Sequence, residues 1–154
     1  MNSDKKNIFI FRKHFAEGRA SDINKLGGKG ANLAEMCNLG IPVPPGITIS
    51  TNVCNYFLEH DSLPKNFKSN LIKYIKKLEK EVGSIFGDAN NPLLFSVRSG
   101  ARQSMPGMME TILNIGLSSR TIPGLIVILL VVYFMYNTLK YNVKKYNLPE
   151  TWRK

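Results

Sequence analysis

The chain has 154 residues, about one domain's worth, with 44% hydrophobic residues and a formal net charge of +10. Its two cysteines, Cys37 and Cys54, are too few and wrongly spaced for a zinc site, so we expect two buried, reduced thiols. The polar residues 1–6 lack the long apolar core of a signal peptide, which favours a cytoplasmic protein.

Short strands and helices alternate in the first part of the chain. Pro42, Pro44 and Pro45 force an extended turn, because proline cannot continue a helix. Thr51 is a plausible N-cap, since its side-chain oxygen can accept a hydrogen bond from the first turn of a helix. In chain order the pattern predicts a strand or two near 8–11, a loop over 17–24, a helix over 30–39, a strand at 47–50 and a helix over 53–59.

A lysine-rich helix is predicted over residues 66–82. Its expected buried stripe is formed by Leu71, Ile75, Leu78 and Val82. The lysines that accompany it are Lys65, Lys68, Lys73, Lys76, Lys77 and Lys80. They suggest nucleic-acid binding, but no aromatic stacking pattern goes with them. We therefore expect a solvated helix face and no nucleic-acid partner.

Two further strands are predicted, over residues 93–97 and near 111–117. The chain shows no internal repeat and no low-complexity region. Strands and helices of this kind, mixed along the chain, indicate the α+β fold class.

The segment from Leu26 to Met36 contains the first phosphate-like motif, Gly28-Lys29-Gly30. A helix N-terminus carries unpaired N–H groups and a partial positive charge, and Lys29 adds a full charge beside it. The motif is not a P-loop, because Lys29 is followed by glycine instead of the Ser/Thr that holds magnesium. Taken alone it is equally typical of a plain turn at a helix start. Glu35, one turn into that helix, is expected to compensate the helix dipole.

The segment from Ser96 to Thr111 contains the second motif, in a loop that follows a predicted strand. The guanidinium groups of Arg98 and Arg102 offer a fixed fork of donors that suits phosphate, with Ser99 beside them. Loops at strand ends often hold binding residues. The role of Arg102 stays open between a phosphate contact and a surface ion pair.

These segments together closely resemble the N-terminus of the pyruvate, phosphate dikinase family, over roughly residues 7–120. The matching stretches are 27–36, 39–51, 86–88, 91–94 and 96–111, in the family's order and spacing. The sister family, phosphoenolpyruvate synthase, shares the Gly-Gly-Lys and Pro-Pro-Gly elements. Its second loop usually runs Arg-Ser-Ser-Ala-Thr, whereas this chain has Arg98-Ser99-Gly100-Ala101-Arg102, which favours the dikinase.

The resemblance implies an ATP-grasp-like nucleotide-binding domain, of which this chain carries the N-terminal portion. In the family, ATP passes a pyrophosphoryl group to a histidine of a mobile central domain; inorganic phosphate removes one phosphoryl, and pyruvate receives the other. Lys29 and Arg98 match residues that contact ATP phosphates, with Gly28, Gly30, Ser99 and Arg102 nearby. Mg²⁺ is the family's metal, and no metal-binding residue of this chain matches its acidic ligands.

Neither histidine matches the family's phosphorylated one. His14 precedes the first motif, and His60 is expected at a solvated helix end. We expect no catalytic residue in this fragment and no complete dikinase cycle from it, so pyruvate and inorganic phosphate are partners only of the complete enzyme. The alternatives are a non-catalytic module that binds a nucleotide or a partner, with or without a membrane tether, and a degraded remnant without activity.

Met105, Gly107, Met108 and Met109 allow two interpretations. The methionines can fill gaps under a loop as flexible apolar side chains. Alternatively, the segment is a flap that closes over the nucleotide phosphates, with Gly100 and Gly107 as its flexible points.

The last part of the chain departs from the family, which divides the sequence into 1–120, the nucleotide-binding portion, and 121–154, a hydrophobic and then basic tail. The apolar run 122–136 has about 15 residues, or about 18 if extended to 139, against the 17–25 of a membrane span. Arg120 and the lysines after the run give no clear orientation. We expect an accidental apolar run in place of a membrane anchor.

Overall fold

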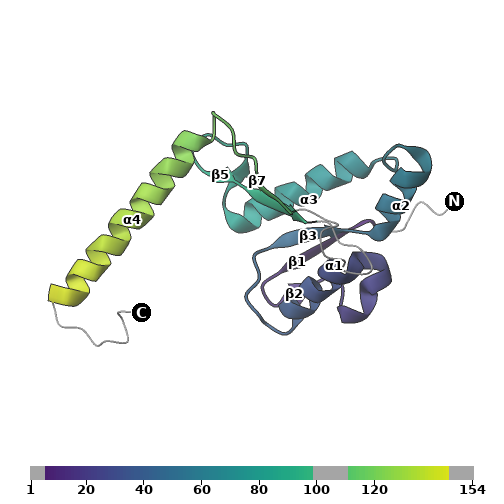
Figure 1. The fold of residues 1–154 in the computed structure, drawn as a ribbon, viewed down its shortest axis with the longest axis horizontal. Helices are drawn as coiled ribbons and strands as arrows, with labels where there is room; N and C mark the ends of the chain where they lie inside the picture. Colours follow the sequence, from purple (N-terminus) through teal and green to yellow (C-terminus); the bar gives the residue numbers. More distant parts are fainter. Residues whose placement is uncertain (1–5, 99–110, 146–154) are drawn as a thin grey trace. The chain divides into compact units, whose positions relative to one another are not determined.

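The computed structural model describes residues 6–98 and 111–145, without the side chains of 141–145 (Figure 1). Contacts divide the chain into two compact units. The first comprises the described residues of Met1–Gly83 and Ser96–Leu113, and the second those of Ser84–Phe95 and Asn114–Lys154. The mixture of helices and strands agrees with the predicted α+β class.

A three-stranded antiparallel sheet of order β2-β1-β3 lies at the centre of the first unit. Its strands are β1 (Ile8–Arg12), β2 (Phe15–Ala16) and β3 (Gly46–Ile49), and the first and third follow the sequence prediction. Phe11 pairs with Gly46, and a side chain at Gly46 would collide with the Phe11 ring. The glycine therefore leaves room for the Phe11 ring beside β3.

Helices cover both faces of this sheet. Neighbouring residues of a strand point to opposite faces, and Phe9 packs with Leu26, Ala31 and Ala34 of helix α1 (Ile23–Asn38). On the other face, a second cluster draws on the helices α2 (Thr51–His60) and α3 (Phe67–Val82). Its buried members are Ile8, Val53 and Phe67, with Ile47, Leu71 and Tyr74 packed against them. The core of the unit thus has two parts, one on each side of β1.

The helix after β2 begins earlier than the sequence predicted. A 3₁₀ turn at Ala20–Asp22 leads into α1 at Ile23, within the expected loop 17–24. The helix is interrupted at Gly27, whose φ of 71° and ψ of 165° are not helical. The expected start at Gly30 therefore lies just after the kink, and the helical turn before it was missed.

Thr51 does not cap α2 as predicted. The N-cap position is Ser50, and Thr51 is already helical; its hydroxyl donates to the backbone oxygen of Asn24 at 2.6 Å. The prediction of α3 is confirmed within one residue at its start, but Val82 is 43% exposed and does not extend the buried stripe. The left-handed Gly83 ends the helix there, so no further turn packs over Val82.

The two thiols differ in their surroundings. Cys37 is fully buried in α1, and this burial raises its pKa, whereas Cys54 is exposed on α2. The expectation of two buried thiols is therefore wrong for Cys54. Val53 beside it occupies the inward face of the helix, so the next residue is turned toward solvent.

The predicted strand 93–97 is split into β5 (Pro92–Leu93) and β6 (Phe95–Arg98). In the second unit, β5 pairs in parallel with β4 (Ile85–Phe86). Strand β6 pairs with β7 (Thr111–Ile115), which confirms a strand near 111–117. The helix α4 (Ile122–Lys145) follows and contains the whole apolar run.

Candidate functional site

Lys29 lies directly after the interruption of α1. Because Gly27 leaves the helical conformation, the residues after it start a new helical segment whose first N–H groups lack the usual carbonyl partners. Lys29 is exposed, and among the described residues it forms no ion pair. Helix starts attract anions, and an unpaired lysine there adds to that attraction.

The two glycines on either side of Lys29 differ in their surroundings. Gly30 is buried, and a Cβ there would lie 2.6 Å from Thr48 Cγ2 and 3.2 Å from Leu26 Cβ. Glycine at this position therefore lets α1 pack closely on β3. Gly28 is half-buried.

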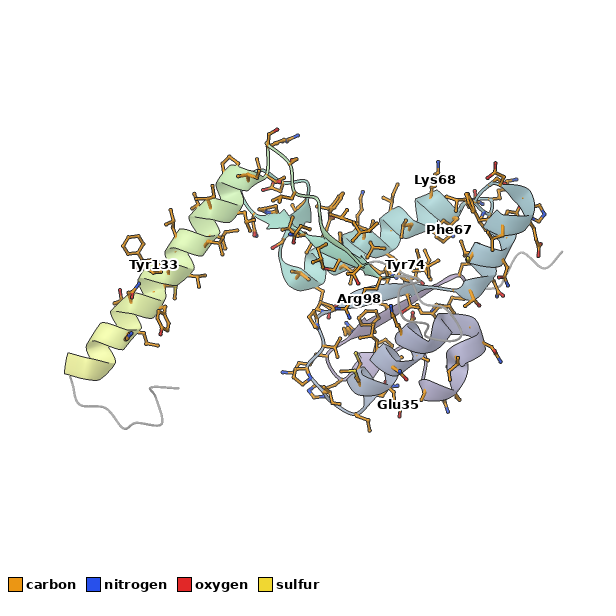
Figure 2. All side chains as sticks on the ribbon, in the orientation of Figure 1. Glu35, Phe67, Lys68, Tyr74, Arg98 and Tyr133 are labelled. Atoms are coloured by element: carbon orange, nitrogen blue, oxygen red, sulfur yellow. The ribbon has the colours of Figure 1, made fainter. Side chains whose placement is uncertain are left out.

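Arg98, labelled in Figure 2, is the last residue of strand β6 and is exposed. Within the part of the chain that the structure describes, it makes no ion pair. Lys29 and Arg98 both belong to the first unit, on α1 and β6. The other predicted residues of this loop lie outside the described residues: Ser99, Arg102, Met105, Gly107, Met108 and Met109.

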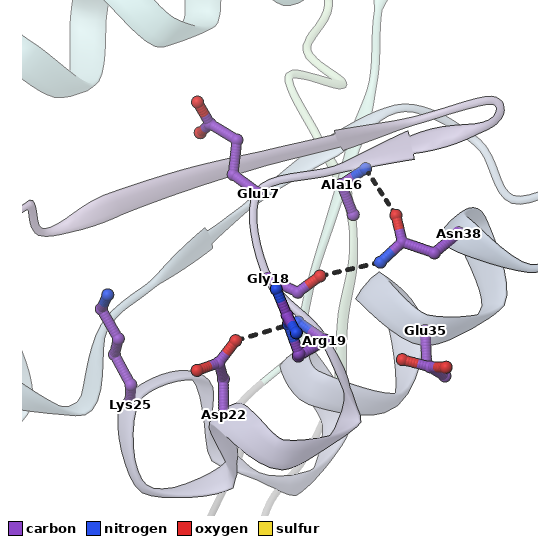
Figure 3. A pocket seen from close by; sticks show the side chains of 8 residues that line it. All are labelled: Ala16, Glu17, Gly18, Arg19, Asp22, Lys25, Glu35 and Asn38. Atoms are coloured by element: carbon purple, nitrogen blue, oxygen red, sulfur yellow. Dashed lines mark hydrogen bonds between the residues drawn. The ribbon is translucent and has the colours of Figure 1, made fainter.

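The first unit also contains an open hollow of about 660 Å³ beside α1 (Figure 3). It is lined by Ala16, Glu17, Gly18, Arg19, Asp22, Lys25, Glu35 and Asn38. Of these residues, sequence reasoning singled out Glu35 alone. No motif marks the others, because they come together only when the segment 16–22 folds back along α1.

Asn38 holds this segment against the helix. Its side-chain oxygen accepts from Ala16 N at 3.1 Å, and its amide nitrogen donates to Gly18 O at 2.8 Å (Figure 3). Glu35 accepts from Ala20 N at 3.0 Å. Since Glu35 lies in the last turn of α1, its expected role in compensating the dipole at the helix start is wrong. Through the hydrogen bond from Ala20 N, the Glu35 carboxylate instead holds the 3₁₀ turn Ala20–Asp22 against α1.

Glu17 links the same segment to β1. Its carboxylate accepts from Ile10 N at 2.9 Å and pairs with Lys6 Nζ at 2.6 Å. Partial burial acts to raise the pKa of Glu17, but these hydrogen bonds and the charges of Lys6 and Lys77 outweigh it and hold the pKa below its usual value. Glu17 is thus a structural carboxylate that stays ionised.

The charged groups of the hollow are largely engaged in such local contacts. Asp22 accepts from Arg19 N at 3.0 Å, and the Lys25 ammonium lies 4.5 Å from the centre of the Phe9 ring. Within residues 6–98 and 111–145, no three His, Cys, Asp or Glu side chains gather closely enough to hold a metal ion. The charged groups of the hollow therefore mostly stabilise the folded loop, whereas Lys29 and Arg98 are exposed and take part in no ion pair among the described residues.

Comparison with known proteins adds to this geometry. The family described as pyruvate phosphate dikinase, AMP/ATP-binding domain, matches residues 23–73. Among curated proteins, the pyruvate, phosphate dikinase of Rhizobium meliloti is 55% identical over 119 residues, 77% of this chain and 13% of its own length. That of Rickettsia conorii is 55% identical over 116 residues, 75% of this chain and 13% of its own. A chloroplastic one from Mesembryanthemum crystallinum is 48% identical over 121 residues, 78% of this chain and 13% of its own.

The segment with the kinked helix thus lies within the match to a nucleotide-binding domain. More particularly, residues 23–73 match the AMP/ATP-binding domain family of pyruvate phosphate dikinase, and the similarity to curated dikinases extends over about three quarters of the chain. The chain spans 13% of the length of these curated relatives.

Proposed function

We propose that this chain binds the phosphates of ATP through Lys29 and Arg98, as part of a pyruvate, phosphate dikinase. The observation that carries the proposal is the kink at Gly27, which leaves an exposed, unpaired Lys29 at the start of a helical segment inside the matched family region. Cations and helix N–H groups are what a polyphosphate requires of its site.

The remaining residues of the proposed site assist these two cations. Gly28 would keep the backbone near Lys29 free of a side chain, so that phosphate oxygens can approach the N–H groups. Gly30 would hold this segment in place, since it lets α1 pack closely on β3. Ser99 and Arg102 would add donors beside Arg98. Met105, Gly107, Met108 and Met109 would close over the phosphates as a flap and exclude water.

In the wider proposal, the domain is ATP-grasp-like and the reaction transfers phosphoryl groups from ATP through a histidine to pyruvate, or in reverse. Such transfer depends mainly on positioning and on neutralising phosphate charge, which Lys29 and Arg98 would supply. Pyruvate, inorganic phosphate and the histidine belong to the complete enzyme. The described residues do not fit a Mg²⁺ site, since no three His, Cys, Asp or Glu side chains among them gather closely enough to hold a metal ion.

Calorimetric titration of the full chain in mild detergent with ATP tests the site. Lys29→Ala and Arg98→Ala should each weaken binding by about 10- to 100-fold, because each removes a charge-assisted hydrogen bond worth about 1.5–3 kcal/mol. Lys76→Ala is the matched control, since Lys76 is also an exposed helical lysine, but on α3.

The control should bind ATP like the unmodified chain, and AMP should bind more weakly than ATP because it offers fewer phosphates. If ATP does not bind, or if all three variants bind it equally, the phosphate site is not at Lys29 and Arg98. Circular dichroism of each variant separates lost binding from lost folding.

A further inference from the structure

We propose that α4 inserts into a lipid bilayer and anchors the chain to a membrane. Its residues Ile122–Lys140 form a continuous 19-residue helix with a mean hydropathy of 2.1. The sequence favoured an accidental apolar run. The shape, surroundings and ends of the helix now favour an anchor, and this inference does not depend on the nucleotide site.

Beyond its first turn, the part of α4 whose side chains are described is largely apolar and largely uncovered. Within the described residues, only 6% of the apolar stretch is buried. The consecutive residues 129–136 are between 50% and 67% exposed, and they make more than two helical turns, so no face is left out. Figure 2 shows side chains projecting all around α4, with Tyr133 labelled. A helix that packs on a protein core has one apolar stripe and one polar face instead.

The length of the helix fits a bilayer. Nineteen residues of helix extend about 28 Å, close to the hydrocarbon thickness of about 30 Å. The sequence alone counted a shorter run, because Asn137 and Thr138 interrupt it. In the structure the helix continues through them, and Asn137 Nδ2 donates to Tyr133 O at 3.0 Å. This hydrogen bond satisfies one donor of the side-chain amide within the helix, which lowers the cost of placing Asn137 in hydrocarbon.

The charges are placed at the ends of the helix. No acidic residue occurs in Ile122–Lys145, while Arg120 precedes the helix and Lys140, Lys144 and Lys145 end it. Long basic side chains at such positions can reach lipid headgroups. The arrangement leaves an uncharged stretch of hydrocarbon length between two basic ends.

The start of the helix is built into the second unit. The hydroxyl oxygen of Thr121, which is 1% exposed, accepts from Ser118 N at 2.9 Å and donates to Gly116 O. Gly124, two residues into α4, is buried against the backbone oxygens of Ala89 and Asn90. The helix therefore begins at a defined point of folded structure and then leaves it.

A bilayer suits this surface better than a second copy of the chain. One partner helix covers a single stripe and would leave the opposite apolar face in water. Lipid surrounds the helix completely, as its uniformly apolar surface requires.

The test is flotation of the full chain on a density gradient after expression in cells and a sodium carbonate wash. The variant Leu129→Lys/Val132→Lys places two charges at the middle of the helix, where they strongly oppose insertion. Leu58→Lys/Ile72→Lys is the matched control, because it also replaces two aliphatic residues by lysine, at exposed positions of α2 and α3, 77% and 55% exposed.

We expect the unmodified chain and the control to float with the lipid after the wash, and the α4 variant to move to the soluble fractions. Flotation separates insertion from aggregation, since aggregates sediment without lipid. The proposal is overturned if the unmodified chain is soluble, if it forms lipid-free aggregates or oligomers, or if the α4 variant floats equally well.

Discussion

Gly30 of α1 packs directly against Thr48 of β3, with the position of a Cβ only 2.6 Å from Thr48 Cγ2. Gly30→Ala should therefore destabilise the first unit by about 1–3 kcal/mol, because overpacking forces helix and strand apart. Urea unfolding of the full chain in mild detergent measures the loss.

Thr48→Ser removes the colliding methyl group and should recover part of the stability lost in Gly30→Ala. The free energy of coupling from the double-mutant cycle then has a stabilising sign. Independent, additive effects of the two substitutions would show that the contact does not limit the approach of α1 to β3.

The lowered pKa of Glu17 predicts that the stability of the fold depends on pH. Its folded pKa is lowered by the hydrogen bond from Ile10 and by Lys6, which outweigh the effect of burial. The ionised carboxylate therefore stabilises the fold above its unfolded pKa, and this stabilisation disappears as the pH falls through the folded value. Glu17→Gln should cost about 1 kcal/mol at pH 7.

The difference between Glu17→Gln and the unmodified chain should shrink as the solution is acidified below the usual glutamate range. Unfolding curves at neutral pH and at successively lower pH measure it. A difference that is constant over this range would mean that the charge of Glu17 contributes nothing.

Asn38 should be important for the segment that lines the hollow. Asn38→Ala removes the hydrogen bonds to Ala16 N and Gly18 O and should lower stability by about 1–2 kcal/mol. Amide hydrogen exchange at residues 16–20 should also become faster. Asn32→Ala is the control, because Asn32 is an exposed asparagine of the same helix; equal effects of the two changes would refute the role of Asn38.

The two cysteines should differ in reactivity. Cys54 is exposed and should react readily with a maleimide in the native chain, whereas Cys37, buried and with a raised pKa, should react only on unfolding. Mass spectrometry of peptides after timed labelling measures both rates. Rapid native labelling of Cys37 would contradict its burial.

Local pattern was sufficient for the elements with strong periodicity. The helix over 66–82 and the strands near 8–11 and 111–117 follow from apolar spacing and from turn residues at their ends. Thr51 was misjudged because its hydroxyl binds Asn24, far back along the chain. For Val82 and Cys54, the helix pattern did not show which positions are covered in the fold.

The candidate site also has some features that the sequence predicts and others that only the tertiary structure determines. The residue order around Lys29 and Arg98 was enough to indicate the family, since motif spacing is written along the chain. The packing of Gly30 on Thr48 and the closure of the 16–22 segment by Asn38 depend on contacts that form only in the folded chain. These features join residues distant in sequence, and no local preference encodes such contacts.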